Sequence, residues 1–382
     1  MNLIELYKIE SNRRGIEEES KRNRCIVEDT MYGMMEGDND VAITMVTILG
    51  SMVAIVGGLI TIQTPKISST IAIKGTGSVS DSRLSLWLPN PITEPSKRAY
   101  EIYVLCYTPI WIIAFCCIVA FGLYEDFDEW SYMKVCVGLS LPYLLQPILF
   151  PSAGSSSSTS TINSNNPDVQ RPILERYSFK ANLWLAVYSF IGNYWYTHYF
   201  YSVLHAKYTM PAHRLNNVPI ALYFATHFYF STYHVFSNML LRKVTTTYHP
   251  NLTRKILYIA VVATFAYFTA FMETLTISAY PDYSFEDRDM AYTVGSAFYG
   301  IYFIVSFPAF FVFDQDIDKK DNNNNNNENS KSTKVSAWDT IISSCGYGMI
   351  IMILLDIVRL YLDIPLVVGS SDVVCSLKGE IL

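Results

Sequence analysis

Eight apolar stretches, each about twenty residues long, most constrain what this chain can fold into. They cover residues 41–62, 102–124, 133–151, 182–204, 218–241, 256–280, 291–313 and 341–363. A helix needs about 20 apolar residues to cross the hydrocarbon core of a bilayer. Only 16% of the 382 residues are charged, whereas an average soluble domain has about 25%. The sequence therefore predicts an all-α, polytopic integral membrane helix bundle.

The charge balance and the residue spacing exclude several kinds of partner. The net charge is −6 and no stretch forms a basic stripe, so a nucleic-acid partner is not expected. The seven cysteines contain no Cys-x-x-Cys pair, which argues against a structural zinc site. The six histidines contain no His-x-x-His cluster of the kind that di-iron membrane oxidases need. The sequence therefore predicts no metal.

The chain divides into a membrane domain and several attached segments. We assign residues 85–363 to the membrane domain, and residues 1–84 to a polar N-terminal extension with one extra hydrophobic segment, 41–62. The Ser-rich stretch 151–167 and the Asn-rich stretch 321–329 are typical of flexible loop insertions. Residues 364–382 form the C-terminal tail.

Lysine and arginine in the loops predict the orientation of the bundle. The loops after the first, third, fifth and seventh apolar segments carry most of these residues. Basic loops remain in the cytosol, so this side of the bundle is expected to be cytosolic. The extra segment 41–62 has no ionisable side chain, and it either spans the membrane or is a dispensable anchor.

Polar residues inside the apolar segments are the candidates for function, because such residues are costly in a membrane. Segment 218–241 carries a polar stripe at helical spacing. Its members are His227, Ser231, His234 and Asn238. Segment 182–204 adds Asn193 and His198. If the helices form a bundle, these groups face a shared interior.

Glu273 is the strongest single candidate. It is a lone carboxyl beside Phe271, Met272 and Leu275, with no basic residue near it on its own segment. Burial disfavours the charged form of a carboxyl, so we expect Glu273 to be neutral at pH 7. A neutral buried carboxyl can deliver a proton to a substrate.

Structural roles compete with these functional ones. His234 and Asn238 are also typical of hydrogen bonds between helices, and the aromatic run around Tyr194 and Trp195 is typical of an interfacial belt. On the residues alone, the chain is a membrane enzyme or a carrier with an aromatic-lined pocket that contains a carboxylic acid and a histidine. A seven-helix receptor is a further alternative, although the acidic-Arg-aromatic signature of that class is missing after the third helix.

Between residues 85 and 363 the chain carries long strings with rare residues in a fixed order. They include Ser85-Leu86-Trp87-Leu88, Lys180-Ala181-Asn182-Leu183-Trp184, Gly192-Asn193-Tyr194, Thr197-His198-Tyr199-Phe200, Asn216-Asn217-Val218-Pro219, Thr226-His227, Glu273-Thr274 and Ile301-Tyr302-Phe303-Ile304-Val305-Ser306-Phe307-Pro308. Together these strings resemble the cyclopropyl-sterol isomerase family (cycloeucalenol cycloisomerase). Residues 1–84 and the two insertions depart from the family pattern.

The resemblance implies an isomerase, an intramolecular lyase of sterol biosynthesis in the endoplasmic reticulum membrane. It implies seven family-like transmembrane helices plus one extra N-terminal hydrophobic helix. The expected reaction opens the 9β,19-cyclopropane ring of a sterol, as in the conversion of cycloeucalenol to obtusifoliol. One proton is delivered to C19 and one is lost from C8, so no cofactor is required. The expected partners are the sterol substrate and the lipid bilayer.

The resemblance also suggests roles for the candidate residues. Glu273 would deliver the proton to C19, and neutral His227 would remove the C8 proton, with His198 as the second choice. The expected substrate-binding residues are Asn193, Tyr194, Trp195, His234, Asn238 and Tyr302. Their aromatic members would stabilise the cationic stage, and Asn193 or Asn238 would bind the 3-hydroxyl.

Overall fold

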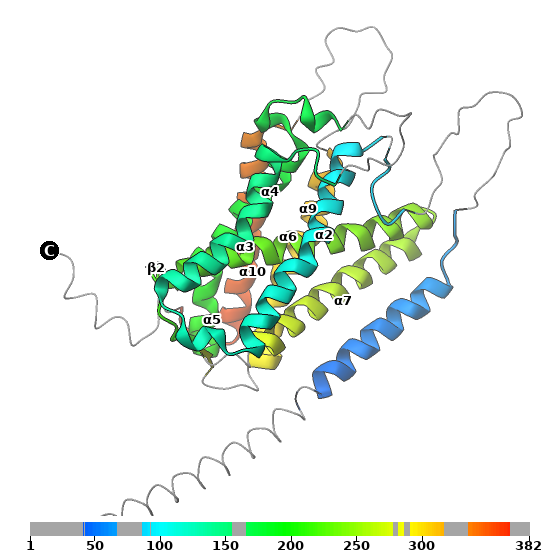
Figure 1. Cartoon of the computed structure of the whole chain (residues 1–382). Helices are drawn as coiled ribbons and strands as arrows, with labels where there is room; N and C mark the ends of the chain where they lie inside the picture. Colours follow the sequence, from blue (N-terminus) through cyan, green and yellow to red (C-terminus); the bar gives the residue numbers. More distant parts are fainter. Residues whose placement is uncertain are drawn as a thin grey trace, which may run out of the picture.

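The computed structural model (Figure 1) describes residues 41, 43–66, 86–91, 93–154, 166–277, 282–285, 291–316 and 335–366. The first forty residues, most of the Ser-rich stretch, the Asn-rich stretch and the tail after residue 366 lie outside the described residues. Each of the eight apolar segments forms a helix.

The helices are long and mostly continuous. They are Ile43–Thr61, α2 (Pro95–Ala120), α3 (Glu129–Leu149), α4 (Tyr177–Ile191), α5 (Thr197–Leu204), α6 (Ile220–Thr247), α7 (Leu252–Ile277), α9 (Ser296–Asp316) and α10 (Ala337–Tyr361). A π-helical turn joins α4 to α5, and a second one precedes α9. These turns are η4 (Gly192–Tyr196) and η5 (Ala291–Gly295).

Among the described residues, short elements occupy the connections. Three are 3₁₀ turns, namely η1 (Leu123–Asp126), η2 (Pro167–Val169) and η3 (Ile173–Glu175). Four are two-residue strands, namely β1 (Lys207–Tyr208), β2 (Arg214–Leu215), β3 (Val218–Pro219) and β4 (Tyr283–Ser284). Strand β1 pairs antiparallel with β4, and β2 pairs antiparallel with β3. The β1–β4 pair therefore joins the loop after α5 to the loop after α7.

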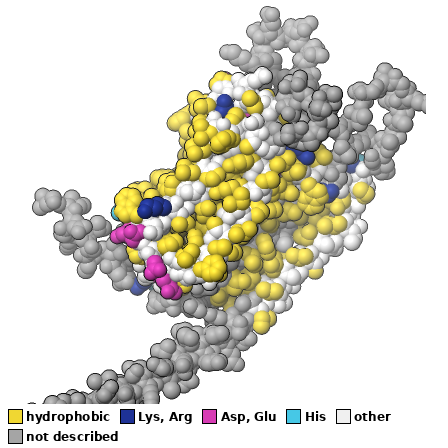
Figure 2. Space-filling model, in the orientation of Figure 1, with side chains coloured by type: hydrophobic (Ala, Val, Ile, Leu, Met, Phe, Trp, Pro, Cys, Tyr) yellow, Lys and Arg dark blue, Asp and Glu magenta, His cyan; other side chains and the backbone are white. Residues whose placement is uncertain are grey.

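The predicted membrane helix bundle is confirmed. Within the described residues, six helices are long and apolar enough to cross a membrane. They are Ile43–Thr61, α2, α3, α7, α10 and the unit formed by η5 and α9. Hydrophobic side chains also dominate the molecular surface in Figure 2, as expected for a protein surrounded by lipid.

The remaining two segments form the centre of the bundle. Helix α4 is short because the π turn η4 ends it, and α6 carries the polar stripe. Trp184 and Tyr188 of α4 and Phe228 of α6 are completely buried. Polar residues on the buried faces of these two helices therefore face protein rather than lipid. Neighbouring helices can supply their hydrogen-bond partners.

An ion pair connects α2 to α6 at the predicted cytosolic end. Glu101 is fully buried, and its Oε2 accepts a hydrogen bond from Arg242 Nη1 at 2.9 Å. The second carboxyl oxygen accepts from Arg242 Nη2. Arg242 also donates to the backbone carbonyl of Trp87 at 2.9 Å. The buried negative charge is thus matched by a fixed positive charge and by hydrogen bonds.

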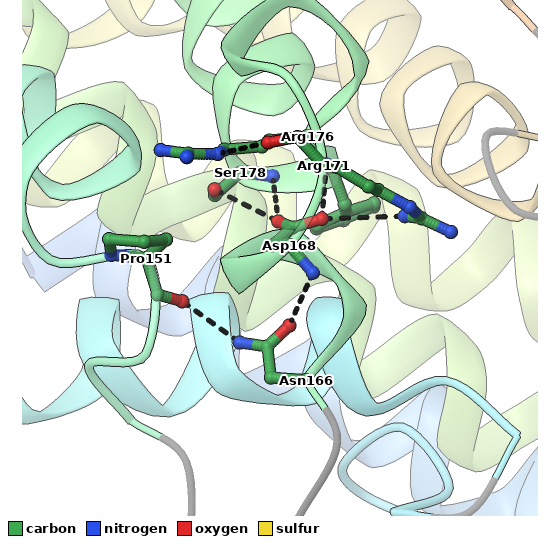
Figure 3. Close-up of polar contacts among 7 residues, drawn as sticks. Pro151, Asn166, Asp168, Arg171, Arg176 and Ser178 are labelled. Atoms are coloured by element: carbon green, nitrogen blue, oxygen red, sulfur yellow. Dashed lines mark hydrogen bonds and ion pairs between the residues drawn. The ribbon is translucent and has the colours of Figure 1, made fainter.

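Asp168 organises the start of α4 at the same end (Figure 3). Its Oδ1 accepts from the backbone N–H of Tyr177 at 3.0 Å, and its Oδ2 accepts from the N–H and the hydroxyl of Ser178, both at 3.1 Å. Arg171 lies 3.3 Å from Oδ1. Because the first N–H groups of a helix have no partner within the helix, this carboxylate stabilises the first turn.

The N-terminal helix Ile43–Thr61 lies along the edge of the bundle beside α7 (Figure 1). Near its start, Tyr267 of α7 donates to the sulfur of Met45 at 3.1 Å. Just after its end, the N–H of Lys66 donates to the carbonyl of Thr247 at 2.9 Å. Most of its side chains are exposed, including Ile55, so this helix contributes little to the buried core.

Candidate active site

A cavity lies where η4 and α5 meet α6, α7 and α9, toward the predicted non-cytosolic end. It contains about 640 Å³ of space without atoms, counting the open space at its mouth. The lining residues are Gly192, Asn193, Thr197, Phe200, Leu204, Tyr208, Thr226, Phe230, Glu273, Thr274, Tyr283, Phe285, Ala291, Gly295, Tyr299 and Tyr302. The wall is therefore largely aromatic, with a few polar groups.

Glu273 brings a carboxyl to this wall from α7. Its Oε2 accepts a hydrogen bond from the hydroxyl of Tyr299, on α9, at 2.8 Å. Tyr233 of α6 also makes a side-chain hydrogen bond with this carboxyl. Both tyrosines are neutral donors, so they orient the carboxyl without supplying a positive charge. Burial of a carboxyl among apolar groups favours its protonated form.

Asn193 presents an acceptor to the same cavity. Its Nδ2 donates to the carbonyl of Ser189 at 2.8 Å and to Thr226 Oγ1 at 2.6 Å. These bonds use both amide hydrogens, so the group that Asn193 can offer to a ligand is its carbonyl oxygen, Oδ1. A ligand hydroxyl could donate to this oxygen.

Two stacked tyrosines line the cavity at the loop end. Tyr208 of β1 and Tyr283 of β4 face each other in the strand register, with ring centroids 4.4 Å apart and planes 17° apart. The connection is anchored to α3, because the hydroxyl of Tyr132 donates to Asp282 Oδ2 at 2.9 Å. This part of the cavity wall therefore depends on the pairing of two loops that are far apart in the sequence.

Both π-helical turns lie against the cavity. Turn η4 supplies Gly192 and Asn193 to its wall, and η5 supplies Ala291 and Gly295. A Cβ atom on Gly295 would lie only 2.8 Å from a methyl group of Leu204, so glycine permits the close approach of η5 to α5. Single π turns are rare and occur often at functional sites.

A comparison with curated proteins identifies the relationship. The cycloeucalenol cycloisomerase of Arabidopsis thaliana is 37% identical over 296 residues, which cover 75% of this chain and 94% of that protein. The chain belongs to the cycloeucalenol cycloisomerase family. It is therefore an isomerase, and the resemblance seen in the sequence is confirmed. No family model and no solved structure matches the chain.

The two candidate bases lie outside the set of residues that line the cavity. His227 of the isomerase is buried between α6 and α4, and its Nε2 lies 3.3 Å from Asn182 Oδ1. His198 of α5 is also buried, with its ring 5.6 Å from that of Tyr201. Within the described part of the chain, the carboxyl and the two imidazoles are therefore not brought together in one cavity.

The other polar candidates on α6 are also deeply buried. His234 has both ring nitrogens engaged, with Nδ1 2.8 Å from the carbonyl of Phe230 and Nε2 3.0 Å from Ser306 Oγ. This pattern matches the interhelical bonding considered for it in the sequence. Asn238 lies one turn further along, and its amide has no hydrogen-bond partner among the described residues.

The aromatic candidates lie in different environments. Tyr302 lines the cavity, with its ring 5.0 Å from that of Tyr299. Tyr194 instead stacks on Phe190 at 5.7 Å, and Trp195 is 43% exposed. Neither Tyr194 nor Trp195 is among the described lining residues.

Several site residues escaped the sequence analysis. Tyr233 and Tyr299 form hydrogen bonds with Glu273. Thr226 accepts from Asn193. Tyr208 and Tyr283 line the cavity. Tyr299 and Tyr302 are three residues apart on one helical face, which could have indicated a shared role. Tyr283 lies in a polar loop and gives no such signal, since its position depends on the pairing of β1 with β4.

Proposed function

We propose that this isomerase opens the 9β,19-cyclopropane ring of a cyclopropyl sterol, as in the conversion of cycloeucalenol to obtusifoliol, in the endoplasmic reticulum. The observation that carries the proposal is the carboxyl of Glu273, held by a tyrosine hydroxyl in the wall of an aromatic cavity. Ring opening needs an acid beside the strained bond. It also needs surroundings that tolerate a carbocation and exclude water.

The reaction consists of two proton transfers. The Glu273 carboxyl gives its proton to C19 while the C9–C19 bond breaks, which leaves a cation at C9. Loss of the proton at C8 then places a double bond between C8 and C9. One proton enters and one leaves, so the reaction needs no oxidant, reductant or cofactor. A positioned acid accelerates such a step by roughly 10²–10⁴-fold.

Aromatic rings in the wall stabilise the cationic stage. Tyr302, Phe200 and Phe230 line the cavity, and the face of an aromatic ring attracts a desolvated cation by about 2 kcal/mol. The stacked pair of Tyr208 and Tyr283 keeps water from the cation, which water would otherwise trap as an alcohol.

The polar end of the sterol requires a hydrogen-bond partner. Asn193 Oδ1 accepts the 3-hydroxyl, because both hydrogens of its amide are already used. His227 as the base that removes the C8 proton, with His198 as the second choice, remains a prediction. Binding roles for Tyr194, Trp195, His234 and Asn238 are likewise predictions.

The deciding experiment is an assay in deuterated water. Membranes that contain the expressed isomerase receive a 9β,19-cyclopropyl sterol, and the products are read by mass spectrometry. We expect a Δ8 sterol that carries solvent deuterium in its C19 methyl group. Unchanged sterol, with the protein shown to be folded and sterol-bound, would contradict the proposal and favour a carrier that uses the same cavity.

A further inference from the structure

We propose that the Glu273 carboxyl performs both proton transfers, so that the group that protonates C19 also removes the proton at C8. This inference rests on the proposed function, because it concerns the same substrate and the same cavity. It differs from the sequence prediction, in which a histidine is the base. The structure supports it through the composition of the cavity, the position of the histidines and the geometry of the substrate.

The lining of the cavity contains few groups that could accept a proton. Among the described lining residues, Glu273 is the one whose side chain is a carboxyl or an imidazole. The amide of Asn193 and the threonine hydroxyls do not take up protons near neutral pH. A tyrosine hydroxyl keeps its proton up to about pH 10 in water, so the phenolate, which is the form that could act as a base, is scarce at neutral pH. Glu273, once it has lost its proton, is the strongest base among the described lining residues.

The basic nitrogen of His227 is directed elsewhere. Asn182 Nδ2 donates to the carbonyl of Ser178 at 3.0 Å, which leaves Asn182 Oδ1 as the acceptor that faces His227 Nε2. His227 therefore carries its hydrogen on Nε2, and its lone pair is on Nδ1. Nδ1 is buried and has no described hydrogen-bond partner. Because His227 is not among the described residues that line the cavity, we do not expect this lone pair to reach a sterol bound there.

The substrate places both reacting positions within reach of one carboxyl. C19 and C8 are both bonded to C9, and in a 9β,19-cyclopropyl sterol the ring and the C8 hydrogen lie on the same face. A carboxyl has two oxygens in one plane, so one oxygen can donate while the other accepts. Tyr299 holds this plane through its hydrogen bond to Oε2, and it stabilises the carboxylate that exists between the two steps.

The bonds balance with this single group. In the first step the carboxyl O–H bond breaks, a C19–H bond forms from the electron pair of the C9–C19 bond, and C9 becomes cationic. In the second step the C8–H bond breaks, its electron pair forms the C8=C9 double bond, and the proton returns to the carboxylate. Each turnover thus ends with the acid protonated.

The experiment replaces each histidine with amides that cannot take up a proton. His227→Gln keeps a polar atom near the position of Nε2, and His227→Asn keeps one near Nδ1, so at least one is expected to preserve the contact with Asn182. His198→Asn is made alongside. Turnover of a 9β,19-cyclopropyl sterol and sterol binding are measured in each purified variant. We expect turnover within about tenfold of wild type in the histidine variants, against a loss of at least about a hundredfold in Glu273→Gln.

A loss of a hundredfold or more in a histidine variant that still folds and binds sterol would overturn the inference and identify that histidine as the base. The proposed function would survive this result, since the wild type would still open the ring. If the wild type leaves the ring intact, the proposed function itself fails.

A label adds a direct test of the shared proton. The wild type is given sterol deuterated at C8 in ordinary water. Deuterium in the C19 methyl group of part of the product would demonstrate that a proton taken from C8 in one turnover is delivered to C19 in a later one, while the remainder has exchanged with solvent between turnovers.

Discussion

Carboxyl groups at the two ends of the bundle have opposite surroundings. At the predicted cytosolic end, Glu101 pairs with Arg242, and Asp168 accepts backbone and hydroxyl hydrogen bonds and contacts Arg171. At the other end, Glu273 is held by tyrosine hydroxyls in the wall of a cavity. Glu101 and Asp168 therefore have cationic or N–H partners that match a carboxylate. Glu273 is held by neutral hydroxyls among aromatic rings, with no cation in this set of partners, so its carboxyl is suited to give up and take back a proton.

The comparison separates structural carboxyls from chemical ones. Removal of the charge from Glu101 should reduce stability, because Arg242 then loses its partner. Removal of the charge from Asp168 should also reduce stability, because the first N–H groups of α4 then lose their acceptor. Removal of the acid from Glu273 should abolish turnover with little loss of stability, because its partners are neutral. The following four changes test this division, in order of decreasing effect.

The largest effect is expected for Glu273→Gln. The amide keeps the size of the side chain and can still accept from Tyr299, but it cannot deliver a proton. We expect turnover to fall by about 10³-fold, with sterol binding and thermal stability close to wild type. Turnover is measured by mass spectrometry of the sterols, and sterol binding to the purified variant serves as the control. Retention of full turnover would remove Glu273 from the reaction.

Glu101→Gln should primarily reduce stability. It leaves the guanidinium of Arg242 buried without its counter-charge, which costs about 3–5 kcal/mol. We expect a lower melting temperature in detergent, and the fraction that remains folded should still turn over sterol. The double variant Glu101→Leu/Arg242→Met removes both charges and should recover part of the loss. A double variant less stable than Glu101→Gln would contradict the ion-pair argument.

Asp168→Ala should have a smaller effect on stability. The change leaves the first N–H groups of α4 without their acceptor, and loss of a helix cap costs about 1–2 kcal/mol. Unfolding of the purified protein in detergent measures the difference. The matched control is Asp339→Ala, which removes the exposed carboxylate that accepts from the N–H of Ser336, the N-cap residue of α10. We expect this control to be the less damaging of the two, since water can reach the exposed helix start.

Tyr299→Phe should have the smallest effect of the four. It removes the hydroxyl that orients Glu273 and stabilises its carboxylate. A hydrogen bond to a charged group contributes about 1.5–3 kcal/mol, and the remaining bond from Tyr233 compensates in part, so turnover should fall about tenfold. Tyr258→Phe is the control, since Tyr258 is also on the α7–α9 side but packs on Phe311 away from the cavity. Equal losses in both variants would argue against a specific role of the Tyr299 hydroxyl.

The sequence predicted the helices well because a membrane-spanning helix needs a long run of apolar residues, which is visible in the composition. All eight apolar segments are helical, and Glu273 stood out as a lone carboxyl in one of them. The bounds were less accurate. Helix α6 extends to Thr247 rather than ending at residue 241, since a helix can continue beyond the apolar core for as long as its polar residues find partners.

The selection among polar residues could not be made from spacing alone. His227, His234 and Asn193 all looked suitable, and each lies on a polar helical face. The structure separates them by their neighbours: Asn193 lines the cavity, His227 faces Asn182, and His234 bonds Phe230 and Ser306. Those neighbours come from other helices, and helical periodicity carries no information about which helices meet.

By itself, the sequence determined that this protein is a membrane helix bundle with one lone carboxyl, because hydrophobic length and the absence of charge are local properties. The strings shared with the cycloeucalenol cycloisomerases determined its family. Only the tertiary structure decided which residues surround that carboxyl. Tyr233 and Tyr299 reach Glu273 from α6 and α9, and Tyr208 meets Tyr283 across two distant loops. Such contacts depend on how the helices pack, since packing brings together side chains that are far apart along the chain.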